Sequence, residues 1–495
     1  MQKDLDILLV VPPFTYATLD EAGPACPHLG IACLASFLEK SQYKVDILDA
    51  FVLRISKEKT LEEIKNCNPK IVGITAVTSE FPYAIDLCKE IKARFPQIIT
   101  ILGGPHATIM PFTCDDLAID YVALGEGEET MLELADFLLR KKGKKENING
   151  IAYRENGKLK LTQSRALINN LDDLPFPAYH LLPMDMYRPY AIFDLHRKFT
   201  SLITSRGCPY QCTYCTSSTV FGKRWVGMSA KRVFELLVYL QDSFGINHFY
   251  FQDDEFTLNH ARIEELCKLI IESKRDMIWE CLARADHVTE EMIQLMAQAG
   301  CRGIVFGAEM GYQWGLEKIK KNVKLEQITK ATSTCRRAGI NTRVSFMMGF
   351  PWESSKEIRQ TIRFAKSLDV DIAYFQILVP YPNTPLYKEI KEEGLIVSND
   401  WNSYVQHSIV GTEPIVRTRY LSSRQLKFWN AYAFLAFYLR PRFLLRQILQ
   451  RNKFGKRNFY RMWRVGFGIL RNAILMMLPE RKKIEKTKKP EYLPS

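Results

Sequence analysis

The chain has 495 residues, of which 47% are apolar and 25% charged, a composition typical of a globular protein of about two or three domains. This balance is not that of a disordered chain, and no apolar run reaches the length of about 18 residues that would predict a transmembrane helix. Residues 420–495 carry 18 Lys and Arg against 3 Asp and Glu, so the net charge of +13 arises there. Such a local basic region argues against a nucleic-acid binder with a uniformly basic surface.

Residues 1–142 alternate short β-branched runs with amphipathic helical patterns. The apolar runs are DILLVV, KVDILD, IVGIT, IITILGG and DYVALG. Strands that alternate with helices predict an α/β domain with a parallel, doubly wound, flavodoxin-like sheet. Such a sheet binds its ligand beyond the carboxyl ends of its strands. The N-terminus lacks the layout of a secretory signal, so we expect a cytoplasmic protein.

A linker is expected over residues 143–198, because charged, Asn, Gly and Pro residues interrupt the pattern there. It contains one hairpin with its turn at Asn156-Gly157. Residues 199–395 repeat six strand and helix units, fewer than the eight of a closed barrel, and predict a partial (β/α)6 TIM-like barrel. Residues 396–495 show no strand signals and predict a helical, basic C-terminal domain.

Three of the twelve cysteines, Cys208, Cys212 and Cys215, stand in the stretch SRGCPYQCTYC. The other nine are scattered singly, as expected of buried thiols. Three thiolates on one loop can hold three irons of a 4Fe-4S cluster and leave the fourth iron open to another ligand. The loop follows the first barrel strand, at the mouth where such barrels keep their active sites. A zinc knuckle or three unrelated thiols are the alternatives.

The segment CPYQCTYC resembles the CxxxCxxC signature of the radical S-adenosylmethionine (radical SAM) superfamily, with the aromatic Tyr214 before the third cysteine. In that family the open iron chelates the amino and carboxylate groups of S-adenosylmethionine. An electron from the cluster then cleaves this molecule to methionine and a 5'-deoxyadenosyl radical. The resemblance therefore implies a 4Fe-4S cluster, S-adenosylmethionine and a reductant such as flavodoxin or ferredoxin.

Other strand ends of the barrel agree with this resemblance. FQDDEF carries three acids, to which the resemblance assigns the binding of the methionyl ammonium group. Asp residues before a helix can also be N-caps. GAEMG would bring a carboxylate to the ribose, MMGFPWES resembles the segment along the adenine, and YPNTPLY has Asn383 where relatives have Gly. Arg284 and Arg343 are expected to face the same mouth, where they could hold a carboxylate. The expected S-adenosylmethionine-binding residues are Tyr214, Asp253, Asp254, Glu255, Glu309, Arg343 and Gly349.

The first domain resembles the cobalamin-binding domain that is fused to many of these enzymes, through ILLVVPP, PHLGIACLASFLEK, ILGGPHAT and DYVALGEGEET. Its glycines would let the backbone approach a bulky ligand, and its hydroxyls could bond the nucleotide tail. The expected cobalamin-binding residues are Pro12, Pro13, Thr75, Thr78, Ser79, Gly103, Gly104, Gly125 and Glu126. A nucleotide-binding or response-regulator-like domain of the same topology is the alternative.

The chain lacks the DxHxxG string that supplies a lower axial His to cobalt in many cobalamin proteins. His28 and His106 do not have its spacing, so we expect cobalt without a His ligand of that motif. This agrees with cobalamin-dependent radical SAM enzymes and argues against the His-ligated mutases.

Together the domains resemble a cobalamin-dependent radical SAM enzyme of the methyltransferase or anaerobic cyclase type. The resemblance implies methyl transfer to an unactivated carbon or to phosphorus, in which one S-adenosylmethionine methylates cobalt and a second yields the radical. Oxidative cyclisation and ring rearrangement use the same architecture. A non-catalytic iron-sulfur or zinc protein is the alternative of another class. A methylthiotransferase is not expected, because the cysteines of the first domain do not form a second trio.

Residues 422–478 show aromatic, Arg-rich helical patterns. They could cap the active site, lie on a membrane surface in a protein with a lipid substrate, or bind an acidic substrate. We expect a small-molecule or lipid substrate and allow peripheral membrane contact. No nucleic-acid partner is expected, since no RNA-binding module pattern is visible.

Overall fold

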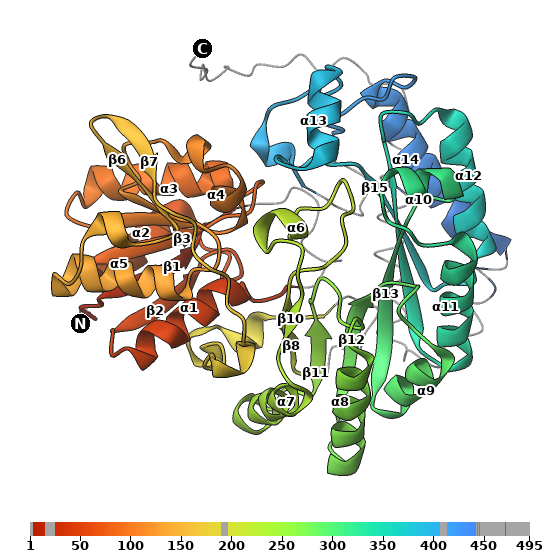
Figure 1. Ribbon diagram of the computed structural model, residues 1–495, viewed down its shortest axis with the longest axis horizontal. Helices are drawn as coiled ribbons and strands as arrows, with labels where there is room; N and C mark the ends of the chain where they lie inside the picture. Colours follow the sequence, from red (N-terminus) through yellow and green to blue (C-terminus); the bar gives the residue numbers. More distant parts are fainter. Residues whose placement is uncertain are drawn as a thin grey trace.

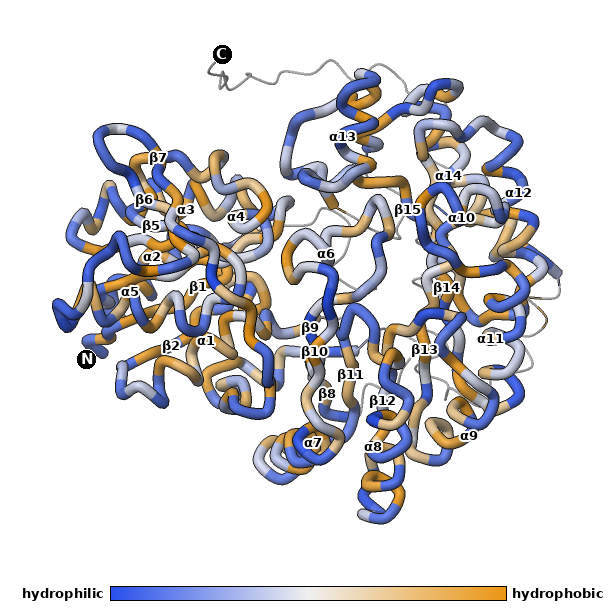
Figure 2. The backbone as a smooth tube through the Cα atoms, viewed as in Figure 1, coloured by the Kyte–Doolittle hydropathy of each residue, from blue (hydrophilic) through white to orange (hydrophobic). Residues whose placement is uncertain are grey.

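The computed structural model describes residues 3–14, 25–189, 197–405, 413–441, 443, 445 and 471. Two α/β units lie side by side, and a C-terminal helical segment runs along the second (Figure 1). Apolar residues concentrate on the strands and polar residues on the outer surfaces of the helices (Figure 2). The predicted α/β fold class is confirmed.

The first unit is a seven-stranded sheet in the order β2-β1-β3-β4-β5-β6-β7. The first five strands are parallel, and their order is that of flavodoxin-like folds, as predicted. The strands are β1 (Ile7–Val11), β2 (Val45–Asp49), β3 (Ile71–Thr75), β4 (Ile99–Gly103), β5 (Tyr121–Ala123), β6 (Ile151–Glu155) and β7 (Lys158–Leu161). The helices are α1 (Leu29–Lys40), α2 (Lys57–Cys67), α3 (Phe81–Arg94), α4 (Pro105–Ile109) and α5 (Glu128–Arg140).

Strand β1 shows how the sequence builds a core on both faces of this sheet. Ile7, Leu9 and Val11 belong to one buried cluster, which also contains residues of α1, α5 and the second unit. Leu8 and Val10 belong to the other cluster, with residues of α2 and α3. Alternate residues of a strand face opposite sides, so a continuous apolar run marks a strand buried on both faces.

The hairpin of β6 and β7 forms at the predicted turn, where Asn156 and Gly157 have φ of 51° and 76°. Two left-handed residues suit a two-residue hairpin loop. The hairpin is part of the first sheet, however, because β6 pairs with β5. It was predicted in the linker, and the structure corrects this: without it, β5 would be an open edge.

The second unit is a sheet of six parallel strands in the order β8-β11-β12-β13-β14-β15, with helices on its outer face (Figure 1). The predicted partial (β/α)6 barrel is confirmed. The strands are β8 (Phe199–Leu202), β11 (His248–Phe251), β12 (Ile278–Ala283), β13 (Cys301–Glu309), β14 (Asn341–Met348) and β15 (Ile372–Ile377). The helices are α7 (Ala230–Phe244), α8 (His260–Ser273), α9 (Glu290–Gln298), α10 (Gln313–Lys318), α11 (Leu325–Arg337), α12 (Ser355–Ser367) and α13 (Pro385–Glu392).

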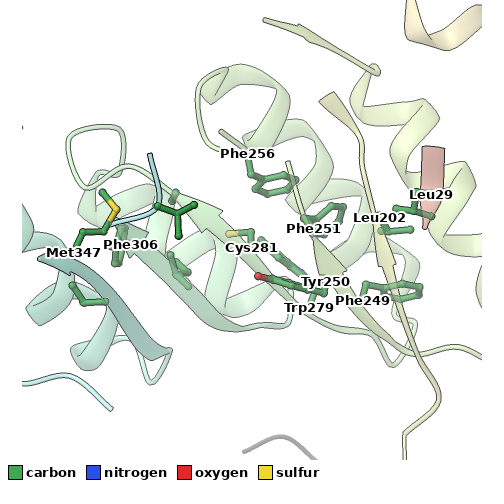
Figure 3. Close-up of a cluster of buried hydrophobic side chains, with 14 of the residues drawn as sticks. Leu29, Leu202, Phe249, Tyr250, Phe251, Phe256, Trp279, Cys281, Phe306 and Met347 are labelled. Carbon is green, nitrogen blue, oxygen red and sulfur yellow. The ribbon is translucent and has the colours of Figure 1, made fainter. Parts of the chain in front are cut away.

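The core between the barrel strands and their helices is aromatic (Figure 3). Phe251 and Phe256 have ring centroids 4.4 Å apart, and Trp279 packs edge-on against Phe251. The same buried cluster contains Leu202 of β8 and Leu29 of α1. The core is therefore continuous across the two units.

Both edges of the open barrel are covered. The linker residue Tyr179 donates to the carbonyl of Ser201 in β8 at 3.2 Å, and α1 packs beside it. At the other edge, α14 (Ser423–Tyr438) lies along β15, where Asn430 and Tyr438 donate to backbone carbonyls at 2.8 and 3.0 Å. Covered edges protect an open sheet from pairing with other chains.

Helix α14 is the main described part of the predicted helical C-terminal domain, and it packs on the side of the barrel. Most of the predicted basic helical region, including residues 446–470 and 472–495, lies outside the described residues. Within the described part of the chain, none of the helices combines the length and apolar character that crossing a membrane requires.

Candidate active site

The three loop cysteines lie at the barrel mouth, on the loop that follows β8 and leads into α6 (Ser217–Val220). The backbone N–H of Cys215 donates to the carbonyl of Cys212 at 3.2 Å, which tightens the loop. Cys208, Cys212 and Cys215 are half-buried free thiols, whereas the other cysteines of the barrel are buried. Half-buried thiols at an open mouth are accessible to a cofactor and to its ligand.

The donor set fits an iron-sulfur cluster. Burial raises the pKa of Cys208 to about 11 and that of Cys215 to about 12, so binding of iron, which requires thiolates, would release protons here. Among the described residues, no three His, Cys, Asp or Glu side chains converge closely enough to hold one metal ion. Three sulfurs that each hold a different iron need not converge on one point.

Two cations lie beside Cys212. Burial raises the pKa of Cys212, and the charges of Lys321 and Arg284 oppose this increase. Arg284 follows β12, lies 3.6 Å from the ring centroid of Tyr210 and donates to Asp286 at 2.9 Å. These positive charges favour the thiolate form of Cys212. Arg284 therefore faces the mouth, as predicted. Lys321 lies there too, although the sequence did not predict it.

The first two acids after β11, Asp253 and Asp254, have different surroundings. Asp253 is buried and accepts hydrogen bonds from the N–H and hydroxyl of Thr204 at 3.1 and 2.9 Å. It therefore braces the chain after β8 instead of facing the mouth, which corrects its expected placement. Asp254 is exposed and accepts from the hydroxyl of Ser217 at 2.6 Å, two residues beyond Cys215.

Glu255, the third acid after β11, is buried. Its carboxylate accepts from Thr257 at 2.6 Å and lies 3.5 Å from Nδ1 of His287. The other ring nitrogen of His287 bonds the hydroxyl of Tyr210, which lies between Cys208 and Cys212 in the sequence. Glu255 and His287 thus contact the cysteine loop through Tyr210.

Glu309 ends β13 in a left-handed conformation with φ of 63°, at a register shift between β13 and β14. Its Oε1 accepts from the hydroxyl of Tyr214 at 2.8 Å and from Nζ of Lys321 at 2.6 Å. A left-handed non-Gly residue costs backbone strain and persists where its surroundings hold it. The structure thus brings together the two predicted residues Tyr214 and Glu309.

The segment after β14 is shaped by Glu353, which sequence reasoning did not single out. The N–H groups of Gly349 and Phe350 donate to its Oε2 at 2.6 and 3.0 Å, and the hydroxyl of Tyr312 donates to Oε1 at 2.8 Å. Gly349 has φ of 107°, which favours glycine. Burial raises the pKa of Glu353 to about 7, although these donors oppose the increase.

Glu353→Gln is expected to change how stability depends on pH. Because the folded pKa is about 7 and the ordinary value 4.5, the native state holds more protons between these values, and the free energy of unfolding falls as pH rises. The stability of the Gln variant relative to the wild type should therefore rise by about 3 kcal/mol from pH 4.5 to 7 and then level off. Urea denaturation of the barrel across this range measures the difference.

Glu357→Gln is the matched control. Burial opposes the shift, but hydrogen bonds from Ser354 lower the pKa of Glu357 below 4.5. Its variant should therefore follow the wild type between pH 5 and 8. Parallel curves for Glu353→Gln and the wild type would contradict the prediction.

Arg343 does not face the mouth. It is the third residue of β14, fully buried, and it forms an ion pair with Glu280 of β12. The other carboxylate oxygen of Glu280 lies 3.0 Å from Nε2 of His248. The mouth lies at the other end of β14, so the expected position of Arg343 was wrong. A strand pattern gives the face of a residue but not its depth in a barrel.

Asn383, at the end of the sixth strand unit, has φ of 59°, which Asn accepts where relatives have Gly. Its side-chain amide donates to the carbonyl of Ile109 in α4. The barrel mouth thus contacts the carboxyl edge of the first sheet.

The residues that are expected to bind cobalamin lie along this edge of the first sheet. Several of them are glycines, which leave the backbone uncovered. A Cβ on Gly104, with φ of 94°, would lie 2.7 Å from the hydroxyl of Thr75, so this position requires glycine. Gly125 has φ of 74° and open space where a Cβ would lie. Such an edge suits a bulky ligand. Pro12 and Pro13 follow β1, Thr78 and Ser79 are buried after β3, and Gly103 ends β4.

The ring nitrogens of His106 are hydrogen-bonded within the protein, and His28 lies beside two acids. The ring nitrogens of His106 lie 3.3 Å from Thr78 and 2.9 Å from Thr113, and burial lowers its pKa to about 4. His28 lies 3.8 Å from Asp49 and 3.7 Å from Glu80. Burial opposes ionisation of His28, but these two acids outweigh it and raise its pKa to about 10.

Glu126 follows Gly125 at this edge, but its carboxylate bonds to other parts of the protein. Its Oε1 accepts from Arg206 at 2.6 Å, and its Oε2 accepts from the N–H of Ile168 at 2.5 Å. Both oxygens are therefore bonded within the protein, and the structure does not place Glu126 as a cobalamin contact. Arg206 precedes the cysteine loop, and no pattern in the sequence singled it out.

Two protein-family models match parts of the chain. The B12 binding domain matches residues 17–135, and the radical SAM superfamily matches residues 202–365. The uncharacterized methyltransferase PH0819 of Pyrococcus horikoshii is 36% identical over 454 residues, which cover 91% of this chain and 96% of the relative. The cytidylyl-2-hydroxyethylphosphonate methyltransferase of Streptomyces wedmorensis is 29% identical, with 75% and 79% covered.

A solved structure shows the same fold. The cobalamin-dependent S-adenosylmethionine radical enzyme OxsB, with aqua-cobalamin and S-adenosylmethionine bound, superposes with a TM-score of 0.71 at 19% identity. The match covers 95% of this chain and 72% of OxsB. The two matched family domains correspond to the two α/β units described above.

Proposed function

Because the chain belongs to the radical SAM superfamily and carries a B12-binding domain, we propose that it transfers a methyl group to an unactivated carbon or to phosphorus. It is an enzyme of the methyltransferase type, and its cofactors are a 4Fe-4S cluster, S-adenosylmethionine and cobalamin. The observation that carries the proposal is the contact between the base of the cysteine loop and the loop after β5, where Arg206 bonds Glu126.

When bound, the cluster supplies the electron that cleaves S-adenosylmethionine to a radical, and cobalamin carries the methyl group. Cys208, Cys212 and Cys215 hold the cluster on one loop. Lys321 and Arg284 place positive charge beside Cys212, which favours its thiolate form. His287, which lies beside Glu255, bonds Tyr210 of the loop and would help to hold the sulfurs in position.

The barrel mouth offers groups suited to each part of S-adenosylmethionine. Asp254 is the exposed acid nearest the third cysteine and would bind the ammonium group. Glu309 would accept from ribose hydroxyls through the oxygen that Tyr214 and Lys321 leave open. The backbone at Gly349, held in its turn by Glu353, would lie along the adenine.

The substrate is proposed to be a small molecule or a lipid. The relative from Streptomyces is named for a phosphonate substrate, which supports a polar small molecule. A flavodoxin or ferredoxin is the proposed reductant. Peripheral membrane contact and a cytoplasmic location stay predictions, because most of the basic helical region lies outside the described residues.

The test uses anaerobically reconstituted protein with about four irons per chain. Given reductant, cobalamin and S-adenosylmethionine with a deuterated methyl group, it should release 5'-deoxyadenosine and label a compound from a small-molecule extract. Mass spectrometry detects the deuterated product. A product that has lost hydrogen without gaining the label would identify an oxidative cyclase, and the absence of 5'-deoxyadenosine would contradict radical chemistry.

A further inference from the structure

The two ends of the cysteine loop meet in a short antiparallel ladder of β9 (Ser205–Arg206) and β10 (Val226–Gly227). Gly207 has φ of 80°, and a Cβ there would lie 2.4 Å from the carbonyl oxygen of Arg224. Only glycine permits this approach. The loop is therefore closed at its base, and an arginine stands at each end.

Both arginines reach the first unit. Arg206 donates to Oε1 of Glu126 at 2.6 Å and to Oε1 of Glu128 at 2.5 Å. Arg224 lies 3.6 Å from Oε2 of Glu126 and donates to the carbonyl of Ile168 at 2.7 Å. Glu126 stands on the loop that leads from β5 into α5, directly after Gly125, and Glu128 is the first residue of α5.

Arg206 and the two carboxylates are buried, Arg224 is 28% exposed, and the group is balanced in charge. The side chains of Glu126, Glu128 and Arg206 are 3%, 4% and 14% exposed. Two guanidinium groups face two carboxylates, so no charge in the group is uncompensated. A guanidinium that bridges two carboxylates fixes direction as well as distance, because its donors form a rigid planar fork.

We propose that Arg206 is a positioning residue, which fixes the cluster loop relative to the cobalamin edge through Glu126 and Glu128. Interfaces between domains of one chain commonly allow relative motion. Here a rigid, buried contact joins the base of the cluster loop to the loop beside Gly125. This role requires that both cofactors bind, but it does not depend on which substrate is methylated.

Arg165 provides a matched control, because it bonds carboxylates of the same helix, α5, from the segment after β7. It donates to Glu129 of α5 at 2.8 Å and also bonds Glu133, and its side chain is 11% exposed. It ties α5 to the chain that follows β7, and it makes no recorded contact with the cysteine loop in the described residues. Replacing Arg165 therefore removes a buried arginine without removing a contact of the cluster loop. Replacing Arg206 removes both.

The experiment measures magnetic coupling between cob(II)alamin and the reduced cluster in the holoprotein, by electron paramagnetic resonance. Arg206→Lys keeps the positive charge but loses the fork. The wild type and Arg165→Lys should show the same coupling, whereas Arg206→Lys should show a weakened or broadened coupling. 5'-Deoxyadenosine formation should continue in all three proteins, since Arg206 does not contact the reacting groups.

Several outcomes would overturn the proposal: no coupling in the wild type, unchanged coupling in Arg206→Lys, or equal loss in both variants. If Arg206→Lys fails to take up the cofactors, Glu128→Gln provides the second test, because Arg206 then keeps its bond to Glu126. Altered coupling in that variant supports positioning. Failure of that variant to take up cofactors would show that these residues serve folding alone. A protein that binds both cofactors but transfers no methyl group would contradict the proposed function and leave this measurement intact.

Discussion

Replacing Cys208, Cys212 and Cys215 together by Ala is expected to abolish the cluster and to reduce 5'-deoxyadenosine formation to the background rate. The three thiols are the proposed ligands on this loop, and the other cysteines of the described barrel are buried, so the variant has no accessible thiolate there to replace them. Iron analysis and visible absorption of the reconstituted protein measure the first effect. Chromatography of the S-adenosylmethionine products measures the second.

Cys26→Ala is the control, since Cys26 is also a half-buried thiol but lies outside the loop. This variant should keep its iron and its cleavage activity. Cleavage that persists in the triple variant would disprove the assignment of the cluster to this loop.

Lys321→Met is expected to destabilise the barrel by about 3–5 kcal/mol. The side chains of Lys321 and Glu309 are each 8% exposed, and their charged atoms lie 2.6 Å apart. Removing the ammonium leaves the carboxylate of Glu309 buried with the hydroxyl of Tyr214 as its remaining recorded donor. The midpoint of urea denaturation of the apoprotein, compared with the wild type, measures the loss.

A double-mutant cycle separates this effect from lost packing. Glu309→Gln in the Lys321→Met background removes the unpaired charge, so the double variant should be more stable than Lys321→Met alone. Lys268 and Glu264 form an exposed pair on α8, and Lys268→Met should therefore change stability little. A double variant whose losses simply add would show that the pair does not interact.

The arrangement of strands could be read from the sequence because it depends on local patterns. Runs such as those of β1 and β14 are long enough to mark a strand, and the helices between them require parallel neighbours. The three cysteines could be identified because all of them lie on one short loop. The strand order of the first sheet is the one that the flavodoxin-like prediction implies.

The residues that the sequence misplaced are those whose partners lie far away in the chain. Glu126 bonds Arg206, 80 positions later, and Arg343 bonds Glu280, 63 positions earlier. Lys321 stands in the run KIKKNVK, which resembles an ordinary surface segment, and only the folded barrel places its ammonium beside Glu309. A local pattern gives the position of a side chain on its element, but not what the next element brings to it.

The hairpin of β6 and β7 also determines where the protein can be divided. A gene fragment that ends at residue 142 would remove two strands from the first sheet and expose the backbone of β5 to other chains. A fragment that continues to residue 165 would keep the sheet whole and retain the attachment of Arg165 to α5. Expression of the cobalamin domain alone therefore depends on a segment that looks, in the sequence, like a spacer.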